Sequence, residues 1–256
     1  QQVTSVNGFS MDQVQEKMAP LISADNEIKL RRQLSQVFGH QEIMVYCGLL
    51  KPEEDLTLTL ENGTSITLSP LSMQDQSGWP EINGLSQQRQ GSAPTDYQKG
   101  TYYFSLPLDS RTYYIQYNQC MEDPELPMET FTAQVMADLE QGSYSVLLLD
   151  LRNNGGGYLS QLTDMLDFLL PEGPIFISRD RAGHEEITNS DADCVELPMA
   201  VLVNADTYSA AEFFAAELQE QGAAVIVGEP TSGKGYSQQT FPLPHGGAVA
   251  ISTGAY

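Results

Sequence analysis

Hydrophobic residues in the first part of the chain recur at the spacings of short strands and helices. A short apolar run ends at Asn7-Gly8, and apolar positions then follow a helical period over residues 11–21 and 28–38. Two alternating runs over residues 56–68 are joined by Asn62-Gly63. An Asn-Gly pair between alternating runs is a strong signal for a β-hairpin. The pattern predicts a small α+β module over residues 1–72.

This pattern stops between residues 70 and 100, where Gln, Ser, Gly and Pro replace most aliphatic residues. Such a composition is typical of a linker or a long excursion. We therefore expect residues 73–99 to separate the first module from a second domain over residues 100–256.

In the second domain, apolar strands come to alternate with amphipathic helices. Two aromatic-rich strands are predicted within residues 101–118, followed by a helix that ends at Gly142. The later strands are expected at 146–151, 175–178, 199–204 and 224–229, with helices at 159–169 and 210–221. Fully apolar strands alternating with helices are typical of an α/β fold with a largely parallel sheet covered on both faces.

Charge excludes some functional classes. The 256 residues include 12 Lys and Arg against 34 Asp and Glu, a net charge of −22. This balance argues against a nucleic-acid binder and against a protein that binds anionic membranes. No apolar stretch approaches the roughly 18–20 residues that cross a bilayer, so we expect no membrane-spanning segment. The chain begins with Gln1 and lacks a signal-peptide pattern, so we expect a trimmed or mature fragment.

Cysteine and histidine positions suggest no metal or cofactor site. Cys47, Cys120 and Cys194 lie far apart without a CxxC pattern, which predicts buried or half-buried free thiols. The three histidines do not have the spacing of metal ligands.

Three loops that follow predicted strands carry unusual residues. Loops at the carboxyl ends of parallel strands are where such sheets meet ligands. The first loop, residues 151–157, contains three consecutive glycines, which allow a backbone to approach an anion or oxyanion closely. A tight strand-to-helix turn with a positive φ is the alternative interpretation.

The second loop, residues 204–212, places Ser209 at the start of a predicted helix. A serine there acts as a nucleophile when the next amide stabilises an oxyanion. However, Ser209 followed by Glu212 also fits a capping box, in which the hydroxyl only satisfies a backbone amide.

The third loop, residues 228–235, resembles a phosphate-binding P-loop but departs from it. Gly235 stands where the motif needs Ser or Thr, and Pro242 and Pro244 exclude the helix that should follow. What remains is Lys234, which is the only lysine after residue 100. It is either a lone surface lysine or a base for a serine, kept neutral by burial.

These motifs, in this order, resemble the tail-specific, or C-terminal-processing, serine peptidases. The resemblance is dense over residues 145–244 and implies a crotonase-like or ClpP-like core. It implies Ser209 as nucleophile, Lys234 as general base and Gln238 as its helper, with the amides of Gly156 and Ala210 as oxyanion donors. It also implies a polypeptide substrate, no cofactor, and export to a bacterial cell envelope or beyond.

The resemblance is looser before residue 100, where the first module resembles part of a PDZ-like domain without its glycine-rich loop. The chain also ends at ISTGAY, where members of the family continue their core, so we expect a truncated core. Three alternatives stay open: a non-catalytic peptide-binding protein on the same fold, a serine enzyme that uses His245 as base, and a nucleotide-binding protein.

Overall fold

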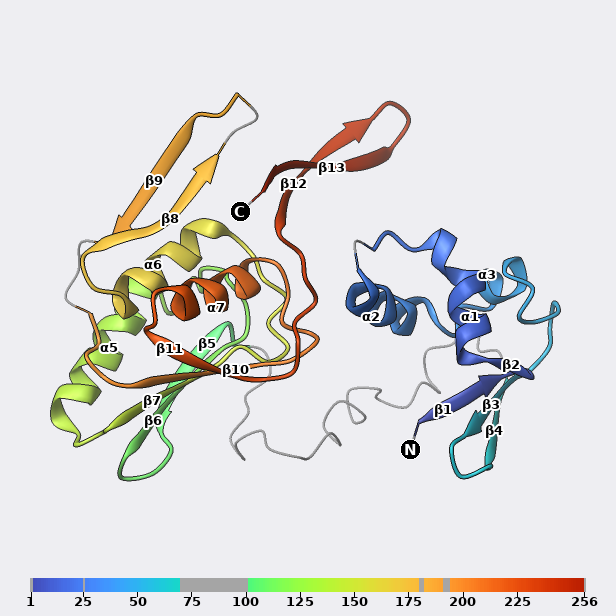
Figure 1. Ribbon diagram of the computed structural model, residues 1–256, viewed down its shortest axis with the longest axis horizontal. Coiled ribbons are helices and arrows are strands. Elements are labelled where there is room, and N and C mark those ends of the chain that lie inside the picture. The colour runs from blue at the N-terminus through green and yellow to red at the C-terminus, as the bar shows by residue number, and fades with distance from the viewer. Residues whose placement is uncertain (1, 25, 70–100, 180–181, 191–193, 256) are drawn as a thin grey trace. The chain divides into compact units, whose positions relative to one another are not determined.

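The protein is described by a computed structural model that covers residues 2–24, 26–69, 101–179, 182–190 and 194–255. The chain divides into two compact units, Gln1–Tyr97 and Gln98–Tyr256 (Figure 1). The predicted linker, residues 73–99, lies outside the described residues, so its role stays a prediction.

The first unit combines a small antiparallel sheet with short helices. Its strands are β1 (Val3–Val6), β2 (Phe9–Ser10), β3 (Leu56–Leu60) and β4 (Ser65–Leu68), in the order β2-β1-β3-β4. Its helices are α1 (Met11–Met18), the 3₁₀ helix η1 (Ala19–Leu21), α2 (Glu27–Val37) and α3 (Gln41–Tyr46). The predicted hairpin is confirmed as β3–β4. Helix α3 was not predicted, because six residues are too few to establish a helical period.

The second unit is built on a five-stranded, mostly parallel sheet. Its strands are β5 (Tyr103–Pro107), β6 (Thr112–Tyr117), β7 (Val146–Asp150), β10 (Met199–Val203) and β11 (Ala224–Gly228). The strand order is β11-β10-β7-β6-β5, and only β5 pairs antiparallel with its neighbour. The helices are α5 (Met128–Gln141), α6 (Leu159–Leu169) and α7 (Ala210–Glu220).

All three helices of the second unit lie on one face of this sheet (Figure 1). The sequence predicted a sheet covered on both faces, and among the described residues these helices cover one face only. From β6 to β7, β10 and β11, each new strand is added on the same side. Because such crossovers are right-handed, a constant direction of addition places every helix on the same face. On the opposite face, the side chains of Val225 and Val227 are exposed.

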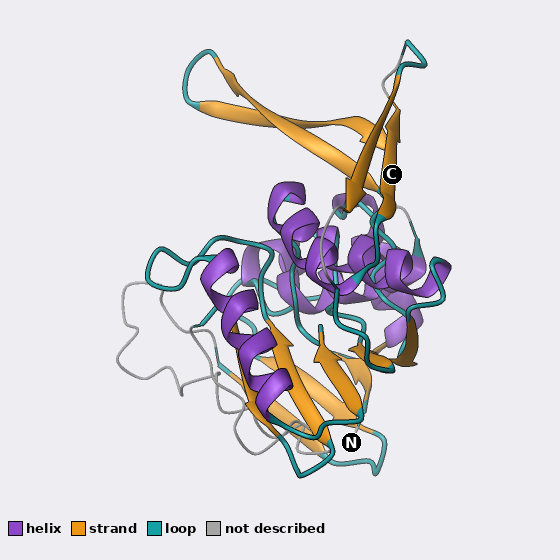
Figure 2. Cartoon of the chain, turned by 90° about the vertical axis from the view of Figure 1, so that its left-hand side faces the viewer, coloured by secondary structure: helices purple, strands orange, loops and turns teal. Residues whose placement is uncertain are grey.

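The remaining strands form a second sheet of two hairpins. These strands are β8 (Gly173–Arg179), β9 (Glu185–Ser190), β12 (Tyr236–Leu243) and β13 (Gly247–Ala255), in the order β12-β13-β8-β9. Both hairpins project beyond the helices (Figure 2). The strand predicted at 175–178 therefore exists, but it pairs with β9 rather than joining the parallel sheet.

The sheet topology positions the candidate site. Strands β7, β10 and β11 are adjacent and parallel, so the three unusual loops leave the same edge of the sheet. In the described part of the chain, no helix is both long enough and apolar enough to span a bilayer.

Candidate active site

Ser209 has a strained backbone at the N-terminus of α7. Its φ is 57° and its ψ is −124°. The two N-cap residues Ser10 and Asn26 instead have extended backbones, with φ of −63° and −153°. An ordinary N-cap residue lies in the β region. The conformation of Ser209 is therefore not explained by capping, and such strain is concentrated at functional sites.

A capping interaction is nevertheless present at this helix start. The Ser209 amide donates to Glu212 Oε2 at 2.8 Å, and the Glu212 amide donates to the Ser209 carbonyl oxygen at 2.8 Å. The two interpretations of the Ser209-x-x-Glu212 pattern are therefore compatible, since Glu212 caps the helix while Ser209 adopts a strained turn.

The glycine turn packs directly against this strained turn. A Cβ atom on Gly156 would lie 2.7 Å from the Tyr208 carbonyl oxygen, 2.9 Å from Ser209 Cβ and 3.0 Å from the Ala210 amide nitrogen. Gly156 also has a φ of 85°, which side chains disfavour. The structure therefore brings Gly156, Ser209 and Ala210 together, and glycine is needed at 156 for close approach as well as for turn geometry.

The two amides predicted as oxyanion donors differ in their present partners. The Gly156 amide donates to the side-chain oxygen of Asn154 at 2.8 Å, whereas the Ala210 amide has no hydrogen-bond partner among the described residues. Asn154 is fully buried, and its Nδ2 donates to the Tyr117 carbonyl oxygen at 2.8 Å. The Ala210 amide is thus available to an oxyanion, while an oxyanion would compete with Asn154 for the Gly156 amide.

Lys234 lies in the loop between β11 and β12 and is partly exposed, so the burial that the sequence suggested for a neutral lysine is not found. Its Nζ donates to Gln238 Oε1 at 3.2 Å and stands 5.0 Å from the centroid of the Tyr208 ring. Tyr208 directly precedes Ser209, so Lys234 Nζ is held beside the strained turn. Within the described residues, however, no hydrogen bond joins Lys234 to Ser209. The structure therefore places Lys234 with Gln238 and next to the Ser209 turn, without a direct hydrogen bond between the predicted base and the predicted nucleophile.

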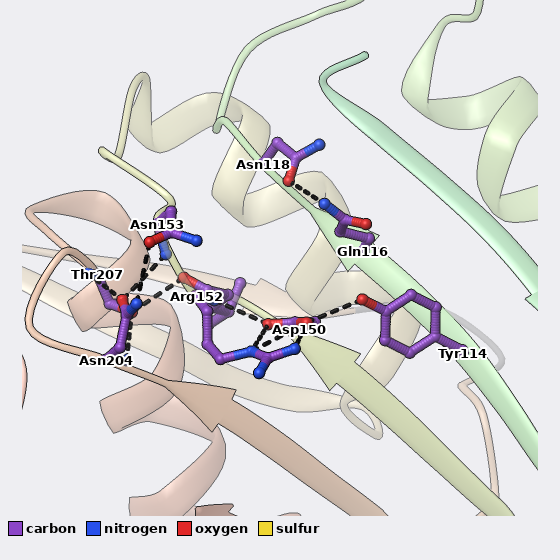
Figure 3. A network of polar contacts seen from close by, with 9 residues as sticks. Tyr114, Gln116, Asn118, Asp150, Arg152, Asn153, Asn204 and Thr207 are labelled. Carbon is purple, nitrogen blue, oxygen red and sulfur yellow. Dashed lines mark hydrogen bonds and ion pairs between the residues drawn. The ribbon is translucent and has the colours of Figure 1, made fainter. Parts of the chain in front are cut away.

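A partly buried ion pair supports the glycine turn at the end of β7 (Figure 3). Asp150 is 2% exposed and accepts hydrogen bonds from the Arg152 guanidinium and, at 2.8 Å, from the Tyr114 hydroxyl. These hydrogen bonds raise the pKa of Arg152. Burial and the neighbouring Asp150 carboxylate raise the pKa of Tyr114, so its hydroxyl keeps its proton as a donor. This group was not predicted from the sequence, although a charged pair at the end of an apolar strand is a detectable signal.

A second polar group joins the glycine turn to the loop before Ser209 (Figure 3). The side-chain oxygen of Asn204 accepts the Asn153 amide at 3.0 Å, and its Nδ2 donates to the Asn153 side-chain oxygen at 3.0 Å. Thr207 Oγ1 donates to the Leu151 carbonyl oxygen at 2.9 Å. These contacts bridge the loops after β7 and β10.

The remaining candidate residues lie as follows. The prediction of free thiols is confirmed, because Cys120 is buried and Cys47 and Cys194 are partly exposed, all unpaired. His245 lies in the exposed turn between β12 and β13, with a φ of 77°. Among the described residues, no hydrogen bond joins His245 to the Ser209 turn.

Comparison with known proteins identifies the family. Residues 111–256, more than half of the chain, match the model of peptidase family S41. The chain belongs to peptidase family S41. Relatives include a carboxyl-terminal-processing protease of Synechocystis sp., 37% identical over 125 residues, which are 48% of this chain and 29% of that protein. Carboxyl-terminal-processing peptidase 2 of Arabidopsis thaliana, a chloroplast protein, is 34% identical over 48% of this chain and 24% of its own length. The match therefore spans less than a third of either S41 relative.

Solved structures of this family agree with the fold. A structure of mature CPAF complexed with lactacystin aligns with a TM-score of 0.62 at 14% identity, covering 98% of this chain and 68% of that one. The photosystem II D1 C-terminal processing protease aligns with a TM-score of 0.52 at 20% identity, covering 99% and 57% of the two chains. At these identities the likeness concerns the fold alone.

Proposed function

We propose that this S41 chain is a serine endopeptidase that cleaves polypeptides through an acyl-enzyme formed on Ser209. The observation that carries the proposal is the strained backbone of Ser209 at the N-terminus of α7. A strained strand-to-helix turn is the geometry that exposes a nucleophilic serine and sets the following amide as an oxyanion donor. Residues that only cap a helix, such as Ser10, do not need it.

The proposed mechanism assigns one role to each residue of the site. Neutral Lys234 takes the proton of Ser209 Oγ as the oxygen attacks a peptide carbonyl carbon. The Ala210 amide, together with Gly156, stabilises the resulting oxyanion. Lys234 then gives its proton to the leaving amine, and water hydrolyses the acyl-enzyme with Lys234 again as base. Gln238 accepts a hydrogen bond from Lys234 Nζ and so orients the base.

The decisive experiment compares two serines that both begin helices. Ser209→Ala should abolish hydrolysis of an unfolded protein substrate and labelling by a fluorophosphonate. Ser10→Ala is the matched control, since the Ser10 hydroxyl accepts from the Gln13 amide in an ordinary cap. It should lower stability by about 0.5–2 kcal/mol and leave hydrolysis unchanged. Hydrolysis that survives in Ser209→Ala would refute the proposal.

A non-catalytic peptide-binding protein on the same fold is the second candidate. It is favoured by one observation, the absence of a hydrogen bond between Ser209 and Lys234 among the described residues. In that case the wild type would bind peptides without cleaving them and would not react with the fluorophosphonate.

We further propose a crotonase-like or ClpP-like arrangement for the second unit and a PDZ-like one for the first. Support comes from the sequence resemblance and from solved relatives that cover 98–99% of the chain. By the same resemblance we propose that the protein acts outside the cytoplasm, in the cell envelope or beyond. Fractionation of cells that express the full-length protein tests this location.

A further inference from the structure

The carboxylate of Glu212 accepts backbone hydrogen bonds from two separate segments of the site. Its Oε2 accepts the Ser209 amide at 2.8 Å and the Lys234 amide at 2.9 Å. Its Oε1 accepts the Gly233 amide. One side chain on the first turn of α7 thus holds the backbone of the proposed nucleophile and the backbone of the proposed base.

Helix capping alone does not explain this arrangement. In α1 the equivalent position is Gln13, whose single side-chain oxygen accepts the Ser10 amide at 2.9 Å. A neutral amide is therefore sufficient for a capping box in this chain. Glu212 differs because its second oxygen and remaining lone pairs accept amides from a loop 21 and 22 residues away in sequence. The negative charge strengthens these hydrogen bonds and is favoured at a helix N-terminus.

The lysine loop is also attached to the loop before Ser209 by Ser232. The Ser232 amide donates to the Thr207 carbonyl oxygen at 3.2 Å, and its hydroxyl donates to the Ala205 carbonyl oxygen at 2.7 Å. These bonds bring the two loops together but do not involve Ser209 or Lys234. Because the Lys234 side chain makes no hydrogen bond to Ser209 in the described structure, the relative position of the two residues depends on their backbones.

We propose that Glu212 is a positioning residue that sets the separation between Ser209 and Lys234. The proposal rests on the proposed function, in which these two residues are nucleophile and base. Glu212 touches neither the substrate nor the reacting atoms in this role. It acts by fixing two main-chain segments, so its loss should slow acylation of Ser209 more than it weakens substrate binding.

The test uses Glu212→Gln with Glu217→Gln as the matched control. Glu217 lies on the same helix and is partly exposed like Glu212. Within the described residues its carboxylate accepts from the Gln221 side chain alone, at 3.0 Å. Both variants remove one negative charge, but only Glu212→Gln replaces an acceptor oxygen with an NH₂ group that faces backbone amides. We expect Glu212→Gln to lower kcat by about tenfold to a hundredfold, because small displacements of reacting groups have effects of this size. KM should change by less than about threefold, and Glu217→Gln should match the wild type in both constants.

Hydrogen exchange separates failure of this inference from failure of the proposed function. Exchange at the amides of Ser209, Gly233 and Lys234, followed by mass spectrometry of folded protein, should accelerate in Glu212→Gln and stay unchanged in Glu217→Gln. Unchanged exchange in Glu212→Gln would overturn the positioning role whether or not the protein cleaves peptides. Faster exchange in Glu212→Gln together with a wild-type kcat would overturn the positioning role as well, since Glu212 would then have a purely structural role. If wild-type protein cleaves nothing and Ser209→Ala changes nothing, the proposed function fails. Hydrogen exchange then still decides whether Glu212 holds the amides of Ser209, Gly233 and Lys234.

Discussion

Gly156 lies so close to Ser209 that a Cβ atom on residue 156 would stand 2.9 Å from the Cβ atom of the serine. The two residues belong to different loops, 53 positions apart in sequence, after neighbouring strands of the parallel sheet. Their contact brings the glycine turn and the strained serine turn together, and with them the proposed oxyanion donors.

This contact predicts different effects for adjacent glycine substitutions. Gly156→Ala should destabilise the protein by roughly 2–4 kcal/mol, because it adds both an overlap and an unfavourable positive φ. Its activity should fall even at temperatures where the variant stays folded. Gly155→Ala is the control, since a Cβ there meets nothing within 4 Å and Gly155 has no positive φ. Urea unfolding and hydrolysis rates measure both effects, and equal behaviour of the two variants would contradict the close approach.

The proposed base predicts a sharp difference between lysine and arginine at position 234. Lys234→Arg should eliminate hydrolysis, because a guanidinium does not release its proton in the accessible pH range. Steady-state assays from pH 6 to 10 would test this, with Ser209→Ala as the zero-activity reference. Wild-type hydrolysis in Lys234→Arg, combined with loss of activity in His245→Ala, would transfer the role of base to His245.

The contact between Gln238 and Lys234 makes a separate prediction. Gln238→Leu removes the acceptor that stands 3.2 Å from Lys234 Nζ. It should reduce kcat, because the flexible lysine side chain then loses its orientation. Gln239→Leu, an exposed neighbour on β12, is the control and should behave as wild type. Equal rates for all three proteins would exclude a helper role for Gln238.

The ion pair between Asp150 and Arg152, at the end of β7, predicts a ranking of stability losses. Arg152→Ala leaves the buried Asp150 carboxylate without its charged partner and should cost about 3–5 kcal/mol. Tyr114→Phe removes one hydrogen bond to that carboxylate and should cost roughly 1–3 kcal/mol. Arg179→Ala breaks an exposed pair with Glu185 and should cost no more than about 1 kcal/mol. Urea denaturation would measure the ranking. If Arg152→Ala were as stable as the wild type, Asp150 would need no cationic partner.

The buried thiol predicts selective reactivity and a pH dependence. Burial raises the pKa of Cys120 from 9.0 to about 12. Since an unfolded thiol ionises first, ionisation favours unfolding, and the stability contributed by this group is complete below about pH 9 and is lost as pH rises from there toward 12. At pH 8 a thiol reagent should label the partly exposed Cys47 and Cys194 but reach Cys120 only in urea. Peptide mapping after labelling would check this, and rapid labelling of Cys120 in folded protein would contradict its burial.

Local elements were predictable because their signals are local. The apolar run at 146–151 and the helical period after Ser209 correspond to β7 and α7, and Asn62-Gly63 forms the turn of the β3–β4 hairpin. The residues of the candidate site came from three short motifs and from their resemblance to a peptidase family. Their catalytic roles stay predictions, whereas membership of family S41 is confirmed over residues 111–256.

Tertiary structure alone decided which distant groups meet. Hydrophobic pattern does not reveal strand order, so it could not show that β8 joins a separate hairpin sheet or that α5, α6 and α7 share one face. That order places the loops after β7, β10 and β11 side by side. Because these loops are neighbours, Gly156 lies in close contact with Ser209, and Glu212 accepts hydrogen bonds from amides of the lysine loop. The sequence by itself determined the strands and helices of the parallel-sheet unit and the candidate residues, though not α3, β9, β12 or β13, because hydrophobic period and turn chemistry act between near neighbours. The contacts of this site join residues that are 21 to 53 positions apart, so they exist only once the parallel sheet has assembled.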